Sequence, residues 1–280
     1  MSAPPLKHVD ANGLRFAYYE EGTGPLVLMV HGFPDTPHTW DAVRPAVAAA
    51  GFRVVTPFQR GYAPSQIPAD GPFDGDTLGA DMLAICDALG EREVILVGHD
   101  WGASAVLSAV GLQPGRVRLL VTVGIPHPAS IVPTPRLAWL VRHFFTLPLP
   151  GAARRIRKGN LVHLDELVQR WSPAWQVPAG ETDAVKRSLG EPGALEAALG
   201  YYRANRPRVP PQQRKKIAVP SVAFAGLDDN IDPVLYDRAR SRYTGPYEVV
   251  RVHGGHFMHR EHPDEFIREL LRVLSPYRAG

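Results

Sequence analysis

The fold of this chain is decided by the stretch Val94-Ile95-Leu96-Val97-Gly98-His99-Asp100-Trp101-Gly102-Ala103-Ser104-Ala105-Val106. Its first four residues are apolar, as in a strand buried on both faces, and small apolar residues at helical spacing follow the turn. Only a few residues separate the expected strand from the expected helix, so we expect Asp100 to have a strained backbone and a side chain presented above the sheet. Gly98 and Gly102 allow the two backbones to approach closely. The pattern predicts the strand–turn–helix motif called a nucleophile elbow.

The residue at the apex of this turn is an aspartate, which changes the expected chemistry. The carboxylate of Asp100 is already ionised at neutral pH, so no partner has to deprotonate it before it attacks. Attack on an sp3 carbon gives an alkyl ester, which a base-activated water can hydrolyse. Acyl transfer is therefore not the first choice. A simpler alternative is that Asp100 only caps the following helix, since Asp is a preferred N-cap residue.

Composition narrows the class of protein. The 280 residues suffice for one large α/β domain or two small ones, and 45% hydrophobic with 21% charged residues is ordinary for a globular protein. The net charge is +3, but no basic run is flanked by aromatic residues in a nucleic-acid pattern, so no nucleic-acid partner is expected. The basic run from Arg154 to Lys158 is interpreted as a solvated helix face.

The termini and the cysteine content indicate a cytoplasmic protein. Cys86 is the only cysteine, so no intrachain disulfide can form. The first ten residues lack the apolar core of a signal peptide, and no stretch is long enough to span a bilayer. We expect no membrane span, and a homodimer is kept open as an assembly.

Strands and helices are expected to alternate through most of the chain. Expected strands cover 14–20, 25–30, 52–57, 94–97, 119–124, 217–226 and 247–252, and expected helices cover 40–50, 76–89 and 265–274. This order predicts a mostly parallel, doubly wound α/β sheet.

The alternation is lost between about residues 126 and 214. Amphipathic segments at 137–145 and 194–203 predict a helical insertion over the carboxyl edge of the sheet. The expected division is a first core part at 1–128, a cap at 129–214 and a second core part at 215–280.

The loop after the strand at 25–30 reads His31-Gly32-Phe33-Pro34. Such a loop can point backbone N–H groups at a developing oxyanion, and we assign this role to the N–H groups of Phe33 and Trp101. His31 is expected to brace the loop through hydrogen bonds.

A base and an orienting acid are expected at the carboxyl ends of later strands, in the chain order nucleophile, acid, histidine. Asp228, Asp229 and Asp232 follow the expected strand that ends at Gly226, and His256 follows the last expected strand. His256 would activate water, and an aspartate would hold its tautomer. Residue types alone leave the three aspartates open.

Four histidines spaced by three residues, His253, His256, His259 and His262, raise the question of a metal site. Glycines between the first two and Pro263 after the last interrupt any single helical face, and no second ligand cluster accompanies them. We therefore expect no metal and no cofactor, with His256 catalytic and its histidine neighbours at the surface.

Taken together, these motifs resemble the α/β-hydrolase fold and, within it, the epoxide hydrolase group. The resemblance rests on His31-Gly32-Phe33-Pro34, Arg60-Gly61-Tyr62, Gly98-His99-Asp100-Trp101-Gly102, Gly226-x-x-Asp229 and Gly255-His256-Phe257. It implies Asp229 as the acid.

The resemblance also implies two cap tyrosines that protonate the epoxide oxygen. Tyr201-Tyr202-Arg203 is similar to the segment that carries one of them. Tyr202 is the better match, and Tyr201 is assigned to substrate binding. No tyrosine occurs near 142–145, where the other would lie, and His143 stands there as a substitute donor or as an ordinary cap residue.

Two other functions stay open. A haloalkane dehalogenase shares the same Asp, Trp, His and acid, and would need a second N–H donor for the halide, for which Trp139, Trp171 and Trp175 are candidates. Fluoroacetate-type dehalogenases fit less well, because Trp101 stands where they have arginine. A non-catalytic binding protein would normally lose part of the triad. Apolar and aromatic residues in the cap favour a small lipophilic substrate.

Overall fold

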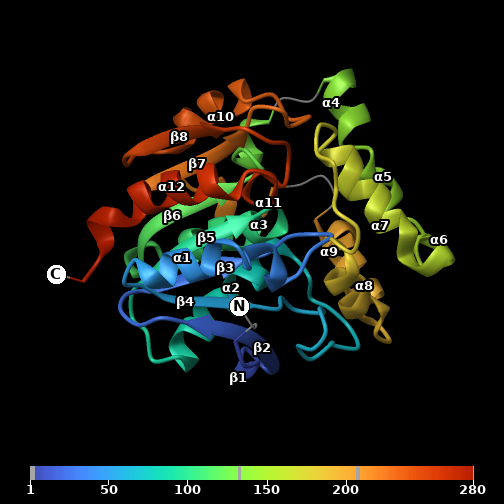
Figure 1. Ribbon diagram of the computed structural model, residues 1–280, viewed down its shortest axis with the longest axis horizontal. Coiled ribbons are helices and arrows are strands. Elements are labelled where there is room, and N and C mark those ends of the chain that lie inside the picture. Colours follow the sequence, from blue (N-terminus) through green and yellow to red (C-terminus); the bar gives the residue numbers. More distant parts are fainter. Residues whose placement is uncertain (1–3, 132–133, 206–208, 280) are drawn as a thin grey trace.

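The computed structural model describes residues 4–131, 134–205 and 209–279. Its centre is a sheet of eight strands in the order β1-β2-β4-β3-β5-β6-β7-β8 (Figure 1). The strands are β1 (Lys7–Ala11), β2 (Leu14–Glu21), β3 (Leu26–Val30), β4 (Arg53–Pro57), β5 (Val94–His99), β6 (Val117–Val123), β7 (Ser221–Gly226) and β8 (Tyr247–Val252). β2 pairs antiparallel with β1 and β4, and all other pairs are parallel. The predicted α/β fold class is confirmed.

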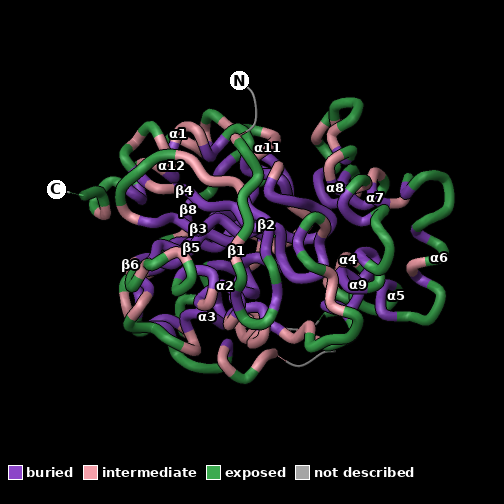
Figure 2. The backbone as a smooth tube through the Cα atoms, turned by 90° about the horizontal axis from the view of Figure 1, so that it is seen from below, coloured by how far each residue is buried: buried purple, intermediate pink, exposed green. Residues whose placement is uncertain are grey.

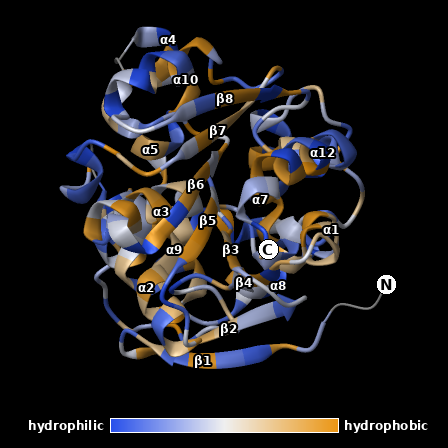
Figure 3. Cartoon of the chain, turned by 90° about the vertical axis from the view of Figure 1, so that its left-hand side faces the viewer, coloured by the Kyte–Doolittle hydropathy of each residue, from blue (hydrophilic) through white to orange (hydrophobic). Residues whose placement is uncertain are grey.

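Helices cover both faces of the sheet, which explains the unbroken apolar runs in its central strands. α2 (Gly75–Ala88) and α3 (Trp101–Leu112) lie on one face, and α1 (Val43–Ala49) and α12 (Pro263–Leu274) lie on the other (Figure 3). Side chains alternate between the two layers: Leu28 and Leu96 belong to the first apolar cluster, and Val27 and Ile95 to the second. The central strands are thus held from both sides, and their ends provide a rigid base for a site.

Among the described residues, six further α-helices lie between β6 and β7 and pack at one side of the sheet (Figure 1). They are α4 (Pro135–Leu140), α5 (His143–Thr146), α6 (Ala152–Ile156), α7 (Lys158–Trp171), α8 (Asp183–Gly190) and α9 (Ala194–Ala204), and we call them the cap. Much of the cap's chain is exposed (Figure 2). The 3-10 turn at Gln212–Arg214 already packs on α3, where buried Gln213 donates to the Ser104 carbonyl at 2.8 Å.

Several element boundaries differ from those expected. β1 is an additional edge strand that pairs only with β2, and its five residues are too short to show a period. β7 begins at Ser221 rather than 217, because Pro220 cannot donate to the ladder, and Ile217 makes only an isolated bridge to Tyr243. The segment expected at 137–145 is divided into α4 and α5. Among the described helices, none is long and apolar enough to cross a membrane.

Candidate active site

Asp100 stands at the sharp turn between β5 and α3. Its backbone has φ +50° and ψ −116°, a conformation that is rare for a residue with a side chain. A Cβ on Gly98 would lie 2.4 Å from the Gly102 carbonyl oxygen, and one on Gly102 would lie 2.2 Å from that of Val30. Only glycine fits at either position, so the predicted close approach of strand and helix is confirmed.

The Asp100 side chain does not cap the helix that it precedes. It makes no capping hydrogen bond, and its Oδ1 instead accepts one from the Phe33 N–H at 2.8 Å. A Cβ on Gly32 would lie 2.4 Å from the Asp100 Cβ, so the loop after β3 reaches the carboxylate only because this residue is glycine. The capping alternative is therefore excluded. The Trp101 N–H, at the first position of α3, has no carbonyl one turn earlier in the helix to bond.

His256 lies between Asp100 and Asp229. Its Nε2 is 3.5 Å from Asp100 Oδ2, and its Nδ1 is 3.5 Å from Asp229 Oδ2. The three residues come from the turns after β5, β7 and β8, which end at the same edge of the sheet. The side chains of Asp229 and His256 are 2% and 7% exposed, and that of Asp100 is 13% exposed, so the carboxylate at the elbow is the most accessible of the three.

The other two candidate acids are engaged elsewhere. Asp228 accepts a hydrogen bond from the Gly254 N–H at 3.1 Å, and Asp232 accepts one from the Val234 N–H at 2.9 Å. Both residues are exposed. Of the three aspartates in this loop, the structure brings Asp229 to the imidazole.

The charge of His256 is controlled by its two carboxylate neighbours. Burial alone would lower the pKa of His256, but Asp100 and Asp229 outweigh burial and raise that pKa to about 10. The imidazole of His256 is therefore protonated at neutral pH. Neutralising Asp100 would remove one of the two charges that hold this proton.

The loop that carries His256 is fastened to the cap and to α11 (Met258–Glu261). The His256 N–H donates to the Trp171 carbonyl at 3.2 Å, and the Phe257 N–H donates to Ser172 Oγ at 3.2 Å. Glu261 Oε1 accepts from Ser172 Oγ at 2.5 Å and from the Gly255 N–H at 2.9 Å. Sequence reasoning missed Ser172 and Glu261, because nothing in the sequence pairs positions 89 residues apart.

Tyr202, on α9, lies over the elbow. Its ring centroid is 5.1 Å from that of Trp101 and 5.4 Å from that of Phe33, both edge-to-face. Within the described residues its buried hydroxyl has no hydrogen-bond partner. Burial raises the pKa of Tyr202 well above its ordinary value of 10.0, so this hydroxyl keeps its proton. The Tyr201 hydroxyl, in contrast, donates to the Arg60 carbonyl at 2.7 Å and holds α9 on the core.

His143, on α5, lies beside Tyr202 and Trp171, with ring centroids 5.9 and 4.7 Å away. Burial, with a smaller contribution from the Arg170 charge, lowers the pKa of His143 to about 3. The imidazole is therefore neutral at physiological pH. A neutral imidazole still has one N–H that can donate.

The three cap tryptophans occupy different environments. Trp171 packs 5.4 Å from the His256 ring, and Trp175 contacts Phe257. Trp139 is 63% exposed on the outside of the cap. The indole N–H groups of Trp171 and Trp101 are buried without a hydrogen-bond partner in the part of the chain that the structure describes.

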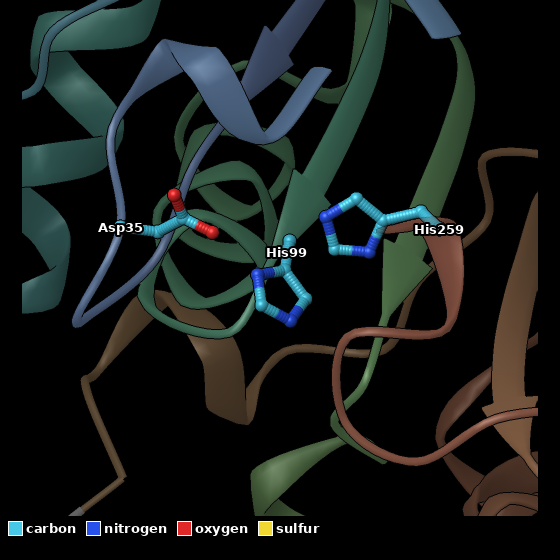
Figure 4. Close-up of side chains that lie close together, drawn as sticks. All are labelled: Asp35, His99 and His259. Atoms are coloured by element: carbon cyan, nitrogen blue, oxygen red, sulfur yellow. The ribbon is translucent and has the colours of Figure 1, made fainter. Parts of the chain in front are cut away.

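Asp35, His99 and His259 form a buried group beneath His256, with possible ligand atoms within 4.8 Å of one another (Figure 4). Asp35 already accepts from the Thr36 N–H and pairs with Arg260, both at 2.8 Å. His99 Nε2 contacts the His256 carbonyl at 3.0 Å, and His259 Nε2 contacts Thr39 Oγ1 at 2.5 Å. Burial lowers the pKa of His99 to about 3. The Arg260 cation beside Asp35 opposes a second cation, so the residues fit a buried support better than a metal site.

The expectation that the histidines near His256 lie at the surface is wrong for His259. Its side chain is fully buried, because Trp40 packs 4.7 Å from its ring and Thr39 bonds it. His253 is exposed. The bracing role of His31 is confirmed: its Nδ1 contacts the Gly32 carbonyl at 2.9 Å, and its Nε2 accepts from the Gln59 N–H at 3.1 Å.

The chain is similar to known proteins over most or all of its length. Residues 25–263 match the α/β hydrolase fold family. The chain is 32% identical to epoxide hydrolase A of Mycobacterium tuberculosis, with 98% of each chain covered, and 27% identical to an epoxide hydrolase of Caballeronia sordidicola, with 97% and 94% covered. The solved structure of epoxide hydrolase VrEH1 from Vigna radiata has the same fold, with a TM-score of 0.82, 22% identity, and 97% of this chain and 98% of that chain covered. With its strained strand–turn–helix motif at Asp100 and this similarity along its whole length, the chain is a hydrolase that belongs to the α/β-hydrolase superfamily and, within it, to the epoxide hydrolase group.

Proposed function

We propose that this protein opens a small lipophilic epoxide to a diol through an alkyl ester on Asp100. The observation that carries the proposal is the meeting of three groups: an accessible carboxylate at the elbow, an imidazole 3.5 Å from it, and the hydroxyl of buried Tyr202 above it, which has no hydrogen-bond partner among the residues that the structure describes. The names of the two relatives support the same reaction.

In the first step, Asp100 attacks a ring carbon and its carboxylate oxygen forms the new C–O bond. The C–O bond of the ring breaks, and its oxygen takes a proton from Tyr202, with His143 as the second donor. Burial keeps the Tyr202 hydroxyl protonated before the reaction, so it can donate when negative charge develops.

In the second step, the ester is hydrolysed. Ester formation removes the negative charge of Asp100, so the pKa of His256 falls and His256 gives up its proton. This proton replaces the one that Tyr202 donated to the epoxide oxygen. Neutral His256, oriented by Asp229, then takes a proton from water. The hydroxide attacks the ester carbonyl, and the Phe33 and Trp101 N–H groups stabilise the oxyanion. The ester C–O bond to the substrate then breaks, and the departing alkoxide takes the remaining proton of the added hydroxyl to become the second alcohol of the diol. Release of the diol leaves Asp100 as a carboxylate and His256 protonated.

The side chains around Asp100 favour an apolar substrate. Phe33, Trp101, Phe144 and Tyr202 form a connected set of aromatic rings, with centroids 5.1 to 5.9 Å apart. Such walls bind an alkyl or aryl group while leaving the few polar groups to orient the oxygen. Tyr201 contributes through its ring, which lies 5.7 Å from that of Trp101.

A haloalkane dehalogenase is the second candidate, because one specific observation favours it. The indole N–H groups of Trp101 and Trp171 are buried without partners among the described residues, and two such donors are what a departing halide requires. The same Asp100 ester and the same His256-activated water would complete that reaction.

One experiment separates these functions. Purified wild-type protein and the Asp100→Asn variant are offered matched aryl and alkyl epoxides and bromoalkanes, and diol and bromide are followed. We expect diol from the wild type alone. Bromide without diol would assign the dehalogenase reaction, and turnover that survives in Asp100→Asn would exclude Asp100 as the nucleophile. If the wild type forms neither diol nor bromide, the result would favour a non-catalytic binding protein.

A further inference from the structure

One segment of the cap exposes large apolar side chains at closely spaced positions in the sequence. Trp139 is 63% exposed, Phe145 61%, Leu149 47% and Phe144 40%. They lie within eleven residues, in α4, in α5 and in the turn that follows α5, at the edge of the molecule away from the sheet (Figure 1). Single exposed apolar residues are normal, but a cluster of this kind indicates a contact surface.

The same segment of the chain is strongly basic. Residues 101–164 contain no aspartate or glutamate. Between positions 134 and 158 the cations are Arg136, Arg142, Arg154, Arg155, Arg157 and Lys158. The rest of the chain contains the other 25 basic residues and all 28 acidic residues, so its net charge is negative.

Most of these cations are not neutralised by the protein. Arg157 pairs with Glu196, and Arg142 lies 4.3 Å over the Trp139 ring. Over the described residues, Arg136, Arg154, Arg155 and Lys158 make no ion pair. Apart from Arg157, the cations from Arg154 to Lys158 therefore form no ion pair within the described part of the chain, and they follow a segment that carries exposed aromatic rings.

We propose that α4, α5 and α6, with their connecting turns, form a docking face for the surface of an anionic lipid bilayer. Aromatic side chains beside arginines are the combination that settles at the boundary between headgroups and acyl chains, and the cations add attraction to anionic headgroups. A second copy of this chain fits less well, because a two-fold contact would bring two faces of six cations together.

This face adjoins the proposed active site. Phe144 is 40% exposed, and its ring centroid lies 5.9 Å from that of Trp101 and 5.2 Å from that of Tyr202. A lipophilic substrate dissolved in the bilayer would therefore meet the protein next to Asp100. This last point rests on the proposed function, whereas docking itself is measured without any turnover.

The test is co-sedimentation of the purified chain with vesicles of phosphatidylcholine alone or with one quarter phosphatidylglycerol. We expect binding to the anionic vesicles at least about tenfold tighter at low salt, and its loss in 0.5 M NaCl, because salt screens exposed charges. Equal binding to both vesicles, or binding to neither, would overturn the proposal.

Two variants locate the face. Trp139→Ala/Phe145→Ala removes the apolar anchors, and Arg136→Glu/Arg154→Glu reverses two exposed charges; each is expected to weaken binding to anionic vesicles about tenfold or more. The matched control is Arg238→Glu/Arg278→Glu, which changes the net charge equally at exposed positions outside the cap. If the control variant loses as much binding to anionic vesicles, the effect would come from the overall charge of the protein, and the assignment of the face would be overturned. The wild type could instead fail to bind vesicles and form a dimer that Trp139→Ala/Phe145→Ala dissociates. That result would identify the face as a contact between two copies of the chain.

Discussion

At the scale of single residues, Asp100 and His256 form a charge pair, and the pKa of His256 depends on whether Asp100 carries a negative charge. The Asp100→Asn variant has the same shape but no charge, and so resembles the neutral ester. We expect the pKa of His256 to fall well below its value of about 10 in this variant, because one of the two carboxylates that raise it is gone. Titration of the His256 ring by NMR measures this change. Asp228→Asn, in the same loop, is the control, and an equal fall there would contradict the assignment.

The same pair predicts how stability depends on pH. The pKa of His256 is raised in the folded protein from 6.5 to about 10, so its contribution to the free energy of unfolding is complete below pH 6.5 and is lost as the pH rises through about 10. The His256→Gln side chain has no such proton. In urea unfolding, we therefore expect the difference in free energy of unfolding between the wild type and His256→Gln to be smaller at pH 10 than at pH 6.5. A difference that grows with pH would contradict this.

Trapping the ester tests the role of His256 directly. If His256 activates the hydrolytic water, His256→Gln should still form the alkyl ester but hydrolyse it about 10² to 10⁴ times more slowly. Intact mass after mixing with an epoxide should show the protein increased by the mass of the substrate. The double variant with Asp100→Asn should show no increase. An active wild type whose His256→Gln variant never accumulates the adduct would argue against the covalent route.

At the scale of elements, the site depends on how closely the β3 loop approaches the elbow. A Cβ on Gly32 would lie 2.4 Å from the Asp100 Cβ, whereas one on Gly115 would meet no atom within 4 Å. We expect Gly32→Ala to destabilise the protein by about 1–3 kcal/mol through overpacking and to reduce turnover, with Gly115→Ala close to the wild type. Urea unfolding and epoxide turnover of both variants check this. Equal behaviour of the pair would mean that the loop can move away from Asp100 without cost.

At the scale of the whole molecule, Arg260 joins the cap to the core. Its guanidinium pairs with Asp35 of the core at 2.8 Å and with Glu181 of the cap at 2.6 Å, and its side chain is 12% exposed. Arg260→Met would leave Asp35 buried without its cation, at an expected cost of about 3–5 kcal/mol in the free energy of unfolding. Arg272→Met breaks exposed surface pairs and should cost no more than about 1 kcal/mol. Unfolding midpoints of the two variants decide whether this contact between cap and core stabilises the fold.

Some features of this protein follow from the sequence alone because they are local. The apolar run before Gly98 and the small residues after Asp100 determine a buried strand, a tight turn and a packed helix, since each depends on neighbours a few positions away. The order of nucleophile, acids and histidine after successive strands also places these residues at one edge of the sheet, because parallel strands end together.

Only the tertiary structure decided which side chains of these candidates meet, because contacts between distant segments depend on packing rather than on local pattern. It brought Asp229, and neither Asp228 nor Asp232, to His256. Over the described ranges, it left the hydroxyl of Tyr202 without a hydrogen-bond partner, whereas the hydroxyl of Tyr201 donates to a carbonyl 141 residues away. It buried His259 against Thr39, 220 residues earlier in the chain, whereas the sequence analysis, having rejected a metal site, expected a surface position. The sequence determined the chemistry that the elbow offers, and folding determined the partners with which that chemistry can work.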